Sequence, residues 1–292
     1  MSIKLGILGG GVMAEAILSR LITANIYATD EILVSDPDSQ RRDFLQQKYG
    51  VRAIVENRSV VGSDILLLAI KPQVLDLVIA EMKNDSAQKP SLVISILAGV
   101  PLARLEAAFP QIPVVRAMPN TPATVGAGIT AIAPGKTVEA SHLDLAKSIF
   151  AAVGEVVEVP ESLMDAVTGL SGSGPAYVAI AIEALADGGV AAGLSRTVAM
   201  QLALQTVFGT AKLLQSGLHP AELKDRVSSP GGTTITGVTE LERAGFRSAL
   251  IEAVLAATRR SRELGKSGIS DRLTVRYLLI NVKEGRSPIK IQ

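Results

Sequence analysis

A run of hydroxyl and glycine residues joins two helical patterns in the C-terminal half of the chain. It reads Arg-Val-Ser-Ser-Pro-Gly-Gly-Thr-Thr and spans Arg226 to Thr234. Pro230 ends the first helix, and the two glycines that follow let the backbone turn without a Cβ penalty. Thr233 or Thr234 then begins the second helix, where unpaired N–H groups and a partial positive charge suit a carboxylate or a phosphate. A turn whose Ser or Thr merely caps the second helix is the alternative interpretation.

A second glycine-rich run, Gly9-Gly10-Gly11-Val12-Met13-Ala14, lies near the N-terminus. It fits the G-x-G-x-x-A pattern of dinucleotide-binding turns, in which each small residue has a physical reason. Gly9 permits the tight turn, Gly11 lets a pyrophosphate approach the backbone, and Ala14 lets helix and strand pack closely. The apolar run Ile3–Leu8 precedes the pattern and a helical pattern follows it. This placement predicts a dinucleotide site rather than an ordinary glycine-rich turn.

The end of the next predicted strand bears on which dinucleotide binds. Ser35 and Asp36 stand where this fold meets the adenosine ribose. An Asp there commonly accepts a hydrogen bond from the 2′-hydroxyl of NAD, whereas Ser35 with Arg41 and Arg42 could hold the 2′-phosphate of NADP. A third role for Asp36 is that of a helix N-cap. These residues leave the choice between NADH and NADPH open.

Further apolar runs alternate with helical patterns along the first half of the chain. They cover Ile65–Ile70, Leu92–Ile96, Val114–Val115, Ile129–Ala133 and Val156–Val159, with the helical segment Ser141–Val153 before the last. Continuous apolar strands separated by helices predict a parallel sheet covered on both faces. Ligands of such sheets bind beyond the carboxyl ends of the strands, which makes Lys71, Asn120 and Thr121 candidate site residues. An ordinary surface lysine is the competing role for Lys71.

The pattern changes after Pro160, beyond which no convincing strand is predicted. Helical patterns cover Leu163–Leu170, Pro175–Gly193, Thr197–Gln215, Pro220–Val227, Ile235–Ala244 and Phe246–Leu264. Glycine within a helix costs about 1 kcal/mol relative to alanine, so the Gly- and Ala-rich run Ala184–Gly193 indicates close helix packing. We predict a Rossmann-like domain over residues 1–160 and an all-helical domain over residues 161–292. Gly285 to Gln292 should form a loose tail.

Composition excludes several classes of protein. The chain has 292 residues, is 48% hydrophobic and has a net charge of +1, a balance that argues against nucleic-acid or membrane-surface partners. It has no cysteine and only two histidines, which excludes disulfides, thiolate chemistry and histidine-rich metal sites. His142 and His219 should be structural, and no metal is expected. The first residues run straight into a strand and the uncharged runs are interrupted, so we expect a cytoplasmic protein without a membrane span.

Two longer motifs, Asp165–Tyr177 and Leu223–Thr234, resemble those of the Δ1-pyrroline-5-carboxylate reductases. Met13, Lys71-Pro72 and Asn120-Thr121-Pro122 fit the same family, and the resemblance covers essentially the whole chain. These enzymes reduce the cyclic imine 1-pyrroline-5-carboxylate to L-proline with NAD(P)H, the last step of proline biosynthesis. The resemblance implies NADPH as the cofactor, with NADH possible. It also implies that the helical domain dimerises, giving a homodimer that could assemble further.

The resemblance also implies site residues. Its cofactor contacts map onto Leu8, Gly9, Gly10, Gly11, Val12, Met13, Ser35, Asp36, Asn57, Ala69, Ile70, Lys71 and Pro72. Its substrate contacts map onto Asn120, Ser229, Gly232, Thr233 and Thr234, and Thr234 matches the catalytic hydroxyl that faces the ring nitrogen. Asp36 stands where another form of the family has Ser, a departure that bears on the usual preference for NADPH. Arg226 replaces an Asn found in some members.

The chemistry of an imine suits these residue types. The imine carbon accepts a hydride while the nitrogen takes a proton, and because the nitrogen is partly protonated in water a Thr hydroxyl can suffice. A ketone reductase would more often need a His, Lys or Tyr donor. A β-hydroxyacid-type dehydrogenase is one alternative, but Ser173–Ala186 lacks the lysine expected there. A non-catalytic NAD(P)-binding sensor is the other, and the loop Ser229–Thr234 would have no evident purpose in it.

Overall fold

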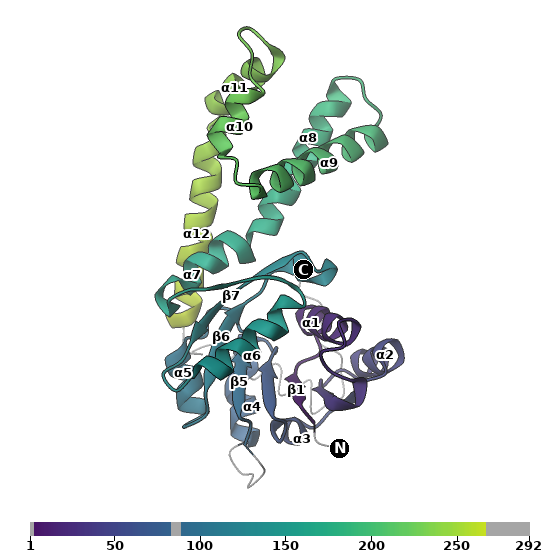
Figure 1. Ribbon diagram of the computed structural model, residues 1–292, viewed down its shortest axis with the longest axis vertical. Helices are drawn as coiled ribbons and strands as arrows, with labels where there is room; N and C mark the ends of the chain where they lie inside the picture. Colours follow the sequence, from purple (N-terminus) through teal and green to yellow (C-terminus); the bar gives the residue numbers. More distant parts are fainter. Residues whose placement is uncertain (1–2, 83–88, 267–292) are drawn as a thin grey trace. The chain divides into compact units, whose positions relative to one another are not determined.

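The computed structural model describes residues 3–82 and 89–266. Eight strands form one sheet in the order β3-β2-β1-β4-β5-β6-β7-β8 (Figure 1). They are β1 Leu5–Leu8, β2 Ile32–Ser35, β3 Arg52–Ile54, β4 Ile65–Leu68, β5 Leu92–Ser95, β6 Val114–Met118, β7 Gly128–Pro134 and β8 Gly154–Glu158. The strand order reverses direction at β1, with β2 on one side and β4 on the other. In a doubly wound sheet this reversal marks the place where a ligand binds.

The sheet is not wholly parallel, because β7 runs antiparallel to β6. A parallel connection needs a crossover of a dozen or more residues, and the segment between Met118 and Gly128 is shorter than that. The segment contains one short 3-10 turn, Thr121–Val125, and the chain then returns alongside β6. The prediction of a purely parallel sheet was therefore wrong at this one pairing. The doubly wound architecture itself is confirmed.

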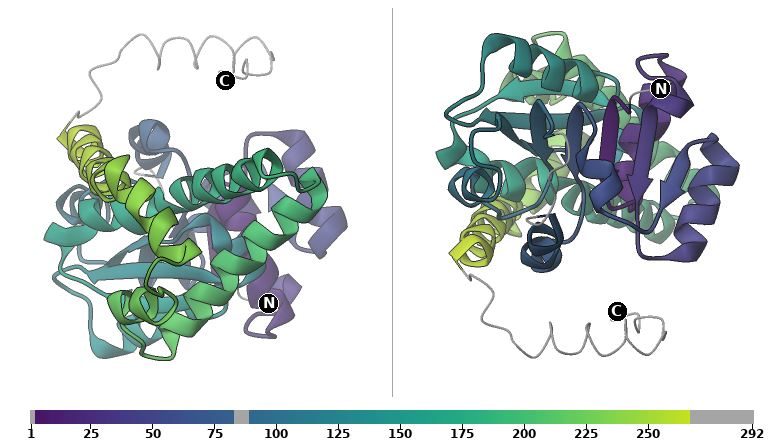
Figure 2. Two further views of the ribbon diagram at one scale, coloured as in Figure 1. Left: turned by 90° about the horizontal axis from the view of Figure 1, so that it is seen from above. Right: turned by 90° about the horizontal axis from the view of Figure 1, so that it is seen from below.

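Helices cover both faces of the sheet (Figure 2). One face packs against α1 Val12–Thr23, α2 Ser39–Tyr49 and α6 Ala140–Ala151. The other packs against α3 Arg58–Val61, α4 Leu75–Met82, α5 Leu102–Ala108 and α7 Met164–Val167. Side chains alternate between these two cores along each strand, so that Leu67 belongs to the first core and Leu66 and Leu68 to the second. Both faces are apolar, which accounts for the continuous apolar runs in the sequence.

The remaining helices are α8 Gly174–Ala191, α9 Arg196–Gln215, α10 Pro220–Arg226, α11 Thr233–Arg243 and α12 Phe246–Lys266. By packing, the described chain divides into two compact units. The sheet unit extends through Gly172 and includes the end of α12 from Thr258, and the helical unit is Ser173–Ala257. Met164 is buried in the second core of the sheet, which explains why residues 161–172 pack with it. The division by role at residue 160 stays a prediction, and Gly285–Gln292 lies outside the described residues.

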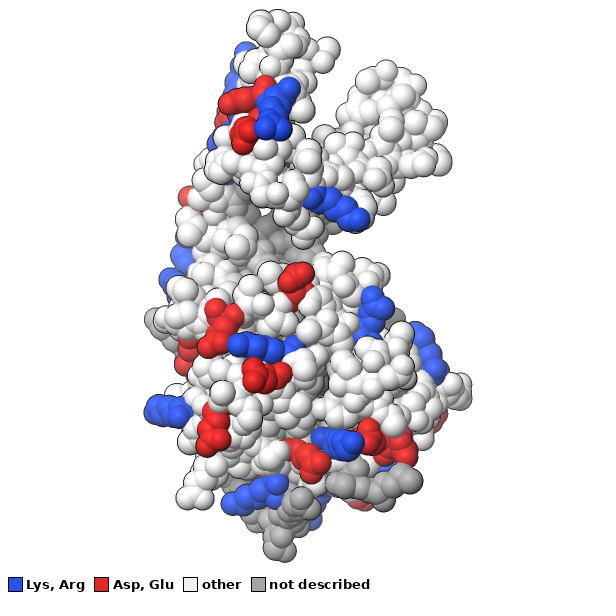
Figure 3. All heavy atoms as spheres, in the orientation of Figure 1, with Lys and Arg blue, Asp and Glu red and all other residues white. Residues whose placement is uncertain are grey.

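The helical unit has a very small core of its own. Among its residues, the only buried apolar side chains are Ala186, Ala199 and Ala203, where α8 packs against α9. Large apolar side chains are exposed instead, with Ile180 65% and Phe208 52% exposed. The face of α8 and α9 visible in Figure 3 carries almost no charged side chain. A helix pair that is apolar on most sides is expected to be covered by another protein surface.

Candidate functional site

The glycine-rich turn after β1 packs directly against the end of β4. Gly9 has a φ of +94°, and a Cβ there would lie 2.7 Å from the carbonyl oxygen of Ala69. The Ala69 N–H donates to Leu8 O at 2.8 Å, which holds the two strand ends together. Leu8 has a fully buried side chain, so only its backbone is available to a ligand. Both the left-handed φ and the close approach require glycine at position 9.

The start of α1 has the features of a phosphate-binding site. Gly11 is the N-cap and supplies no side-chain hydrogen bond to the N–H groups of the first turn. A Cβ on Gly11 would meet nothing within 4 Å, and Val12 is 67% exposed. Open space beside uncapped N–H groups at a helix N-terminus fits the anionic pyrophosphate of a dinucleotide. The geometry therefore suits the cofactor that the G-x-G-x-x-A pattern predicts.

The Asp36 carboxylate, predicted to lie near the cofactor ribose, holds two backbone N–H groups. Its Oδ2 accepts from Gly10 N at 2.7 Å and its Oδ1 accepts from Asp38 N at 2.9 Å. The helix N-cap of α2 is Asp38, whose side chain accepts from the N–H groups of Gln40 and Arg41. The alternative that Asp36 caps this helix was therefore wrong. Asp36 instead links the end of β2 to the glycine-rich turn.

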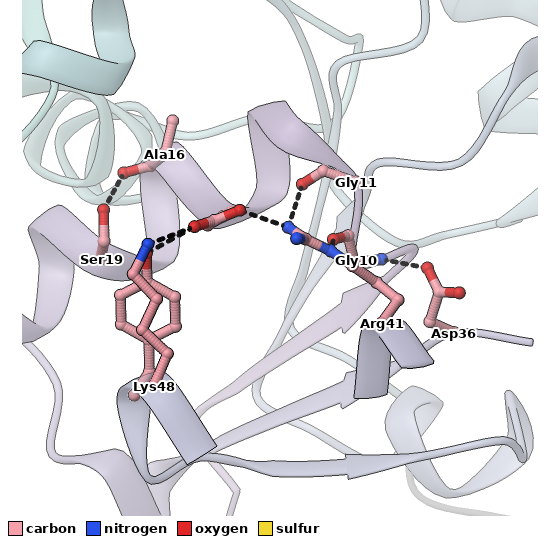
Figure 4. Close-up of polar contacts among 9 residues, drawn as sticks. Gly10, Gly11, Ala16, Ser19, Asp36, Arg41 and Lys48 are labelled. Carbon is pink, nitrogen blue, oxygen red and sulfur yellow. Dashed lines mark hydrogen bonds and ion pairs between the residues drawn. The ribbon is translucent and has the colours of Figure 1, made fainter. Parts of the chain in front are cut away.

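Arg41 reaches from the first turn of α2 to the same glycine-rich turn (Figure 4). Its Nε donates to Gly10 O, and its Nη2 lies 3.4 Å from Gly11 O. Nη2 also forms an ion pair of 2.6 Å with Glu15 Oε2. The neighbouring Arg42 donates instead to the carbonyls that follow β2, Asp36 O at 2.8 Å and Pro37 O at 3.0 Å. The two arginines proposed for a 2′-phosphate thus have different surroundings.

Glu15 is the centre of a four-residue cluster that joins α1 to α2. Besides Arg41, it accepts from Lys48 Nζ at 3.0 Å and from Tyr49 OH at 2.6 Å. Burial opposes ionisation of Glu15, but the hydrogen bonds from Tyr49, Arg41 and Lys48 outweigh it and lower the pKa of this carboxyl to about 2. No motif in the sequence indicated this cluster. Its members lie in two helices whose relative rotation no local pattern reveals.

Ser35 and Asn57 form a polar pair beneath the end of β2. The Ser35 hydroxyl is buried and donates to Asn57 Oδ1, and Asn57 Nδ2 donates to Glu81 Oε2 at 2.8 Å. Because Ser35 is 1% exposed, its hydroxyl supports Asn57 in this structure. Their contacts with a nucleotide stay predictions.

The end of β4 contributes the segment Ala69-Ile70-Lys71-Pro72. Pro72 begins a short 3-10 turn, Pro72–Val74, that turns the chain into α4. Lys71 is exposed at the carboxyl end of β4, next to the strand that leads into the glycine-rich turn. The sheet order therefore brings the predicted cofactor residues after β1, β2 and β4 to three neighbouring strand ends.

Asn120, predicted to contact the substrate, is buried and hydrogen-bonded within the sheet unit. Its Nδ2 donates to Ser171 O at 3.2 Å and its Oδ1 accepts from Ile129 N at 2.9 Å. Ser171 belongs to the π-helical turn Thr168–Gly172 that follows α7. Asn120 thus ties the β6–β7 connection to the motif Asp165–Tyr177. Its contact with a substrate stays a prediction.

The loop between α10 and α11 has the predicted glycine turn and an open helix start. Gly231 has a φ of +67°, and Gly232 N donates to Ser229 O at 3.0 Å. Gly232 is the N-cap of α11 and makes no side-chain cap, so the alternative of a Ser or Thr cap was wrong for this helix. Thr233 and Thr234 are its first two residues, with Thr234 half-buried. The backbone N–H groups at the start of α11 have no side-chain cap, so they are available to bind a carboxylate.

Several other candidates have structural partners. Arg226 Nη2 pairs with Glu222 Oε1 at 2.7 Å on the exposed side of α10. His219 accepts from Ala221 N at 3.2 Å at the start of α10, and His142 accepts from Glu139 N at 3.1 Å at the start of α6. Both histidines therefore act as helix-capping residues.

Two structural absences can be stated for residues 3–82 and 89–266. Acidic and histidine side chains nowhere form a group of three that could hold a metal ion. Within the same ranges, the helices lack the combination of length and apolar character needed to cross a bilayer.

Comparison with known proteins extends over nearly the whole chain. It is 64% identical to the pyrroline-5-carboxylate reductase of Synechocystis over 268 residues, which are 91% of this chain and 100% of that protein. It is 50% identical to that of Methanosarcina acetivorans, with 90% and 98% of the two chains covered. Residues 161–264 match the family described as pyrroline-5-carboxylate reductase dimerisation. Residues 4–99 match the family described as NADP oxidoreductase coenzyme F420-dependent.

Solved structures give the same result. The pyrroline-5-carboxylate reductase of Coxiella burnetii is 36% identical with a TM-score of 0.82, covering 90% of this chain and 99% of that one. The Plasmodium falciparum pyrroline carboxylate reductase with NADP bound is 33% identical with a TM-score of 0.81, covering 90% and 98%. With identity well above 30% over nearly full length, the chain belongs to the pyrroline-5-carboxylate reductase family.

Proposed function

We propose that this protein reduces 1-pyrroline-5-carboxylate to L-proline with a hydride from NAD(P)H, the last step of proline biosynthesis. The observation that carries the proposal is the 64% identity to a reductase of that name over its entire length. The uncapped start of α11 and the open start of α1 supply, in the same chain, places for a carboxylate and for a pyrophosphate.

On the substrate side, the loop Ser229–Thr234 would bind the ring carboxylate. The backbone N–H groups at the start of α11 and the hydroxyls of Ser229 and Thr233 would hold the negative charge, because the helix dipole favours an anion there. Thr234 would donate a hydrogen bond from its hydroxyl to the ring nitrogen and hold the imine in place, while the proton that the nitrogen takes comes from water. We propose Asn120 as a further substrate contact. No strong side-chain acid is needed, since the imine nitrogen is itself basic.

On the cofactor side, the turn from Leu8 to Met13 would hold the pyrophosphate, with Ala69–Pro72 and Asn57 making further contacts. The bound dinucleotide supplies the hydride, and the protein supplies binding and orientation. We propose NADPH as the preferred donor, with NADH also accepted. Asp36 should reduce the preference for NADPH over NADH, because an ionised carboxylate beside the ribose repels a 2′-phosphate.

We further propose that the helical unit forms a homodimer and that dimers associate further. The match to a dimerisation family over residues 161–264 and the exposed apolar side chains of α8 and α9 support the dimer. Residues 1–160 would bind the dinucleotide, and residues 161–292 would dimerise and bind substrate. We propose the cytoplasm as its location, where reduced NAD(P) is available.

The direct test follows NAD(P)H absorbance at 340 nm with 1-pyrroline-5-carboxylate as substrate. A β-hydroxy acid with oxidised cofactor serves as the comparison for the alternative dehydrogenase. We expect oxidation of NAD(P)H in the first assay only. Cofactor binding without turnover of either substrate would favour the non-catalytic sensor.

The role of Thr234 is tested by Thr234→Ala at saturating cofactor. Losing a hydrogen bond made mainly in the transition state should lower kcat by roughly 10- to 1000-fold. Thr236→Ala is the matched control, since its hydroxyl is bonded to Gly232 O at 3.0 Å within the helix. Unchanged kcat and KM in Thr234→Ala would remove this residue from the mechanism.

A further inference from the structure

The peptide groups of the glycine-rich turn are held from two sides by charged residues of the β2–α2 region. The Gly10 N–H donates to Asp36 Oδ2 at 2.7 Å, and the Gly10 carbonyl accepts from Arg41 Nε. The Gly11 carbonyl also faces Arg41, with Nη2 3.4 Å away. Both ends of one glycine residue are therefore bonded to side chains of opposite charge.

Arg41 is itself held in place. Its Nη2 pairs with Glu15 Oε2 at 2.6 Å, and the other oxygen of Glu15 accepts from Lys48 and Tyr49. The Glu15 side chain is 19% exposed and that of Arg41 is 22% exposed, so water screens the pair only in part. An arginine with two hydrogen bonds to the turn and an ion pair in α1 is poorly placed to move toward a new ligand.

We infer that Arg41, held by Glu15, is a positioning residue of the cofactor turn rather than a ligand of the cofactor 2′-phosphate. Its guanidinium fixes the carbonyls of Gly10 and Gly11 on the α2 side. The N–H groups at the start of α1 are thereby held ready for the pyrophosphate. The inference rests on the proposed binding of NAD(P)H, and nothing in it depends on the identity of the imine.

The two roles predict different cofactor dependence. NADH and NADPH share the pyrophosphate, and only NADPH has the 2′-phosphate. Loss of a residue that positions the turn should weaken the binding of both cofactors by the same factor. Loss of a 2′-phosphate ligand should weaken the binding of NADPH alone. Hydrogen bonds to charged groups have a net strength of 1.5–3 kcal/mol, which corresponds to roughly 10- to 100-fold in binding.

The experiment measures Kd for NADPH and for NADH by the fluorescence of the dinucleotide or by calorimetry, without substrate, in the full chain. The variants are Arg41→Met and Glu15→Gln. Arg104→Met is the matched control, because it removes an arginine–carboxylate pair of the same length, 2.6 Å to Asp76, on the opposite face of the sheet. Thermal melts establish that each variant is folded. Glu15→Gln keeps the size of the side chain and serves if Arg41→Met does not fold.

We expect both Kd values to rise about tenfold or more in Arg41→Met. In Glu15→Gln they should rise by a smaller but equal factor, and in Arg104→Met they should not change. Because the variants act on the dinucleotide alone, KM for 1-pyrroline-5-carboxylate should stay the same. A loss confined to NADPH, or no loss for either cofactor, would overturn the inference. A wild-type chain that binds neither dinucleotide would instead refute the proposed function, and this inference with it.

Discussion

Gly231 and Gly232 are neighbours in the loop before α11, yet the structure gives them different reasons to be glycine. Gly231 has a φ of +67°, and a Cβ there would meet nothing within 4 Å. Gly232 has a φ of −77°, which any residue adopts, but a Cβ there would lie 2.3 Å from Ser229 Oγ. Substitution by alanine should therefore strain the backbone at Gly231 and displace a hydroxyl at Gly232.

These geometries set the expected changes in unfolding free energy and in KM. Gly231→Ala places a side chain in the left-handed region, at a cost of about 1–2 kcal/mol, so its unfolding free energy should fall by that amount. Gly232→Ala should lower the unfolding free energy by no more than about 1 kcal/mol, because the exposed Ser229 hydroxyl can rotate away and only the Ser229 carbonyl oxygen, 3.1 Å from the new Cβ, must shift slightly. If the Ser229 hydroxyl binds the substrate carboxylate, that rotation removes a charge-assisted hydrogen bond. KM for the imine should then rise by roughly 10-fold or more, with KM for NADPH unchanged.

The assay combines urea unfolding with steady-state kinetics for Gly231→Ala, Gly232→Ala, Ser229→Ala and the double variant Ser229→Ala/Gly232→Ala. Because the Gly232 substitution acts through the Ser229 hydroxyl, it should add little once that hydroxyl is gone. If Gly232→Ala raises KM as much in the Ser229→Ala background as in the wild type, the substitution does not act through the Ser229 hydroxyl. A Gly232→Ala variant that is destabilised but has an unchanged KM would contradict this role of the hydroxyl as well.

Asp36→Ser should raise kcat/KM for NADPH relative to NADH, because it removes a negative charge near the ribose; an equal change for both cofactors would show that Asp36 does not face the 2′-position. The lowered pKa of Glu15, about 2, means that its cluster stabilises the fold fully above pH 4.5, and that this contribution disappears as the pH falls toward 2. The urea midpoints of the wild type and Glu15→Gln should therefore converge as the pH falls from 4.5 to 2. If the difference between the two midpoints stays constant over this range, ionised Glu15 does not stabilise the fold. Ala191→Arg should bury an unpaired charge between subunits and dissociate the dimer. Light scattering tests this, and an active wild-type species with the 30.5 kDa mass of one chain would rule the dimer out.

The elements of the fold were predictable because their signals are local. Apolar runs such as Ile65–Leu68 are strands buried on both faces, and the G-x-G-x-x-A run begins directly after β1 and continues into the first turn of α1, as its spacing requires. The helices of the C-terminal half follow from runs of helix-forming residues that are separated by turns rich in glycine, serine and proline, such as Ser228–Gly232. The motif residues that suggested the site lie on loops and element ends, where such residues are visible in the sequence.

Side-chain partners were not predictable in the same way. The sequence suggests a ribose contact or an N-cap for Asp36, but its bond to Gly10 depends on how the β2 end meets the turn. The Glu15–Arg41 pair depends on the rotation of two helices about their axes, which periodicity does not set. The antiparallel β7 was missed because the apolar pattern of a buried strand is the same in both directions.

The helical unit buries only three alanine side chains in its own core. Folding of this unit within a single chain therefore gains little free energy from apolar burial. The sheet unit has two full cores and can form as soon as one chain collapses. Refolding should therefore show an early phase whose rate is independent of protein concentration and a later phase that accelerates with it, since encounter of two chains becomes the slow step. Between these phases the exposed apolar helices are open to aggregation, so the yield of refolding should pass through an optimum in protein concentration.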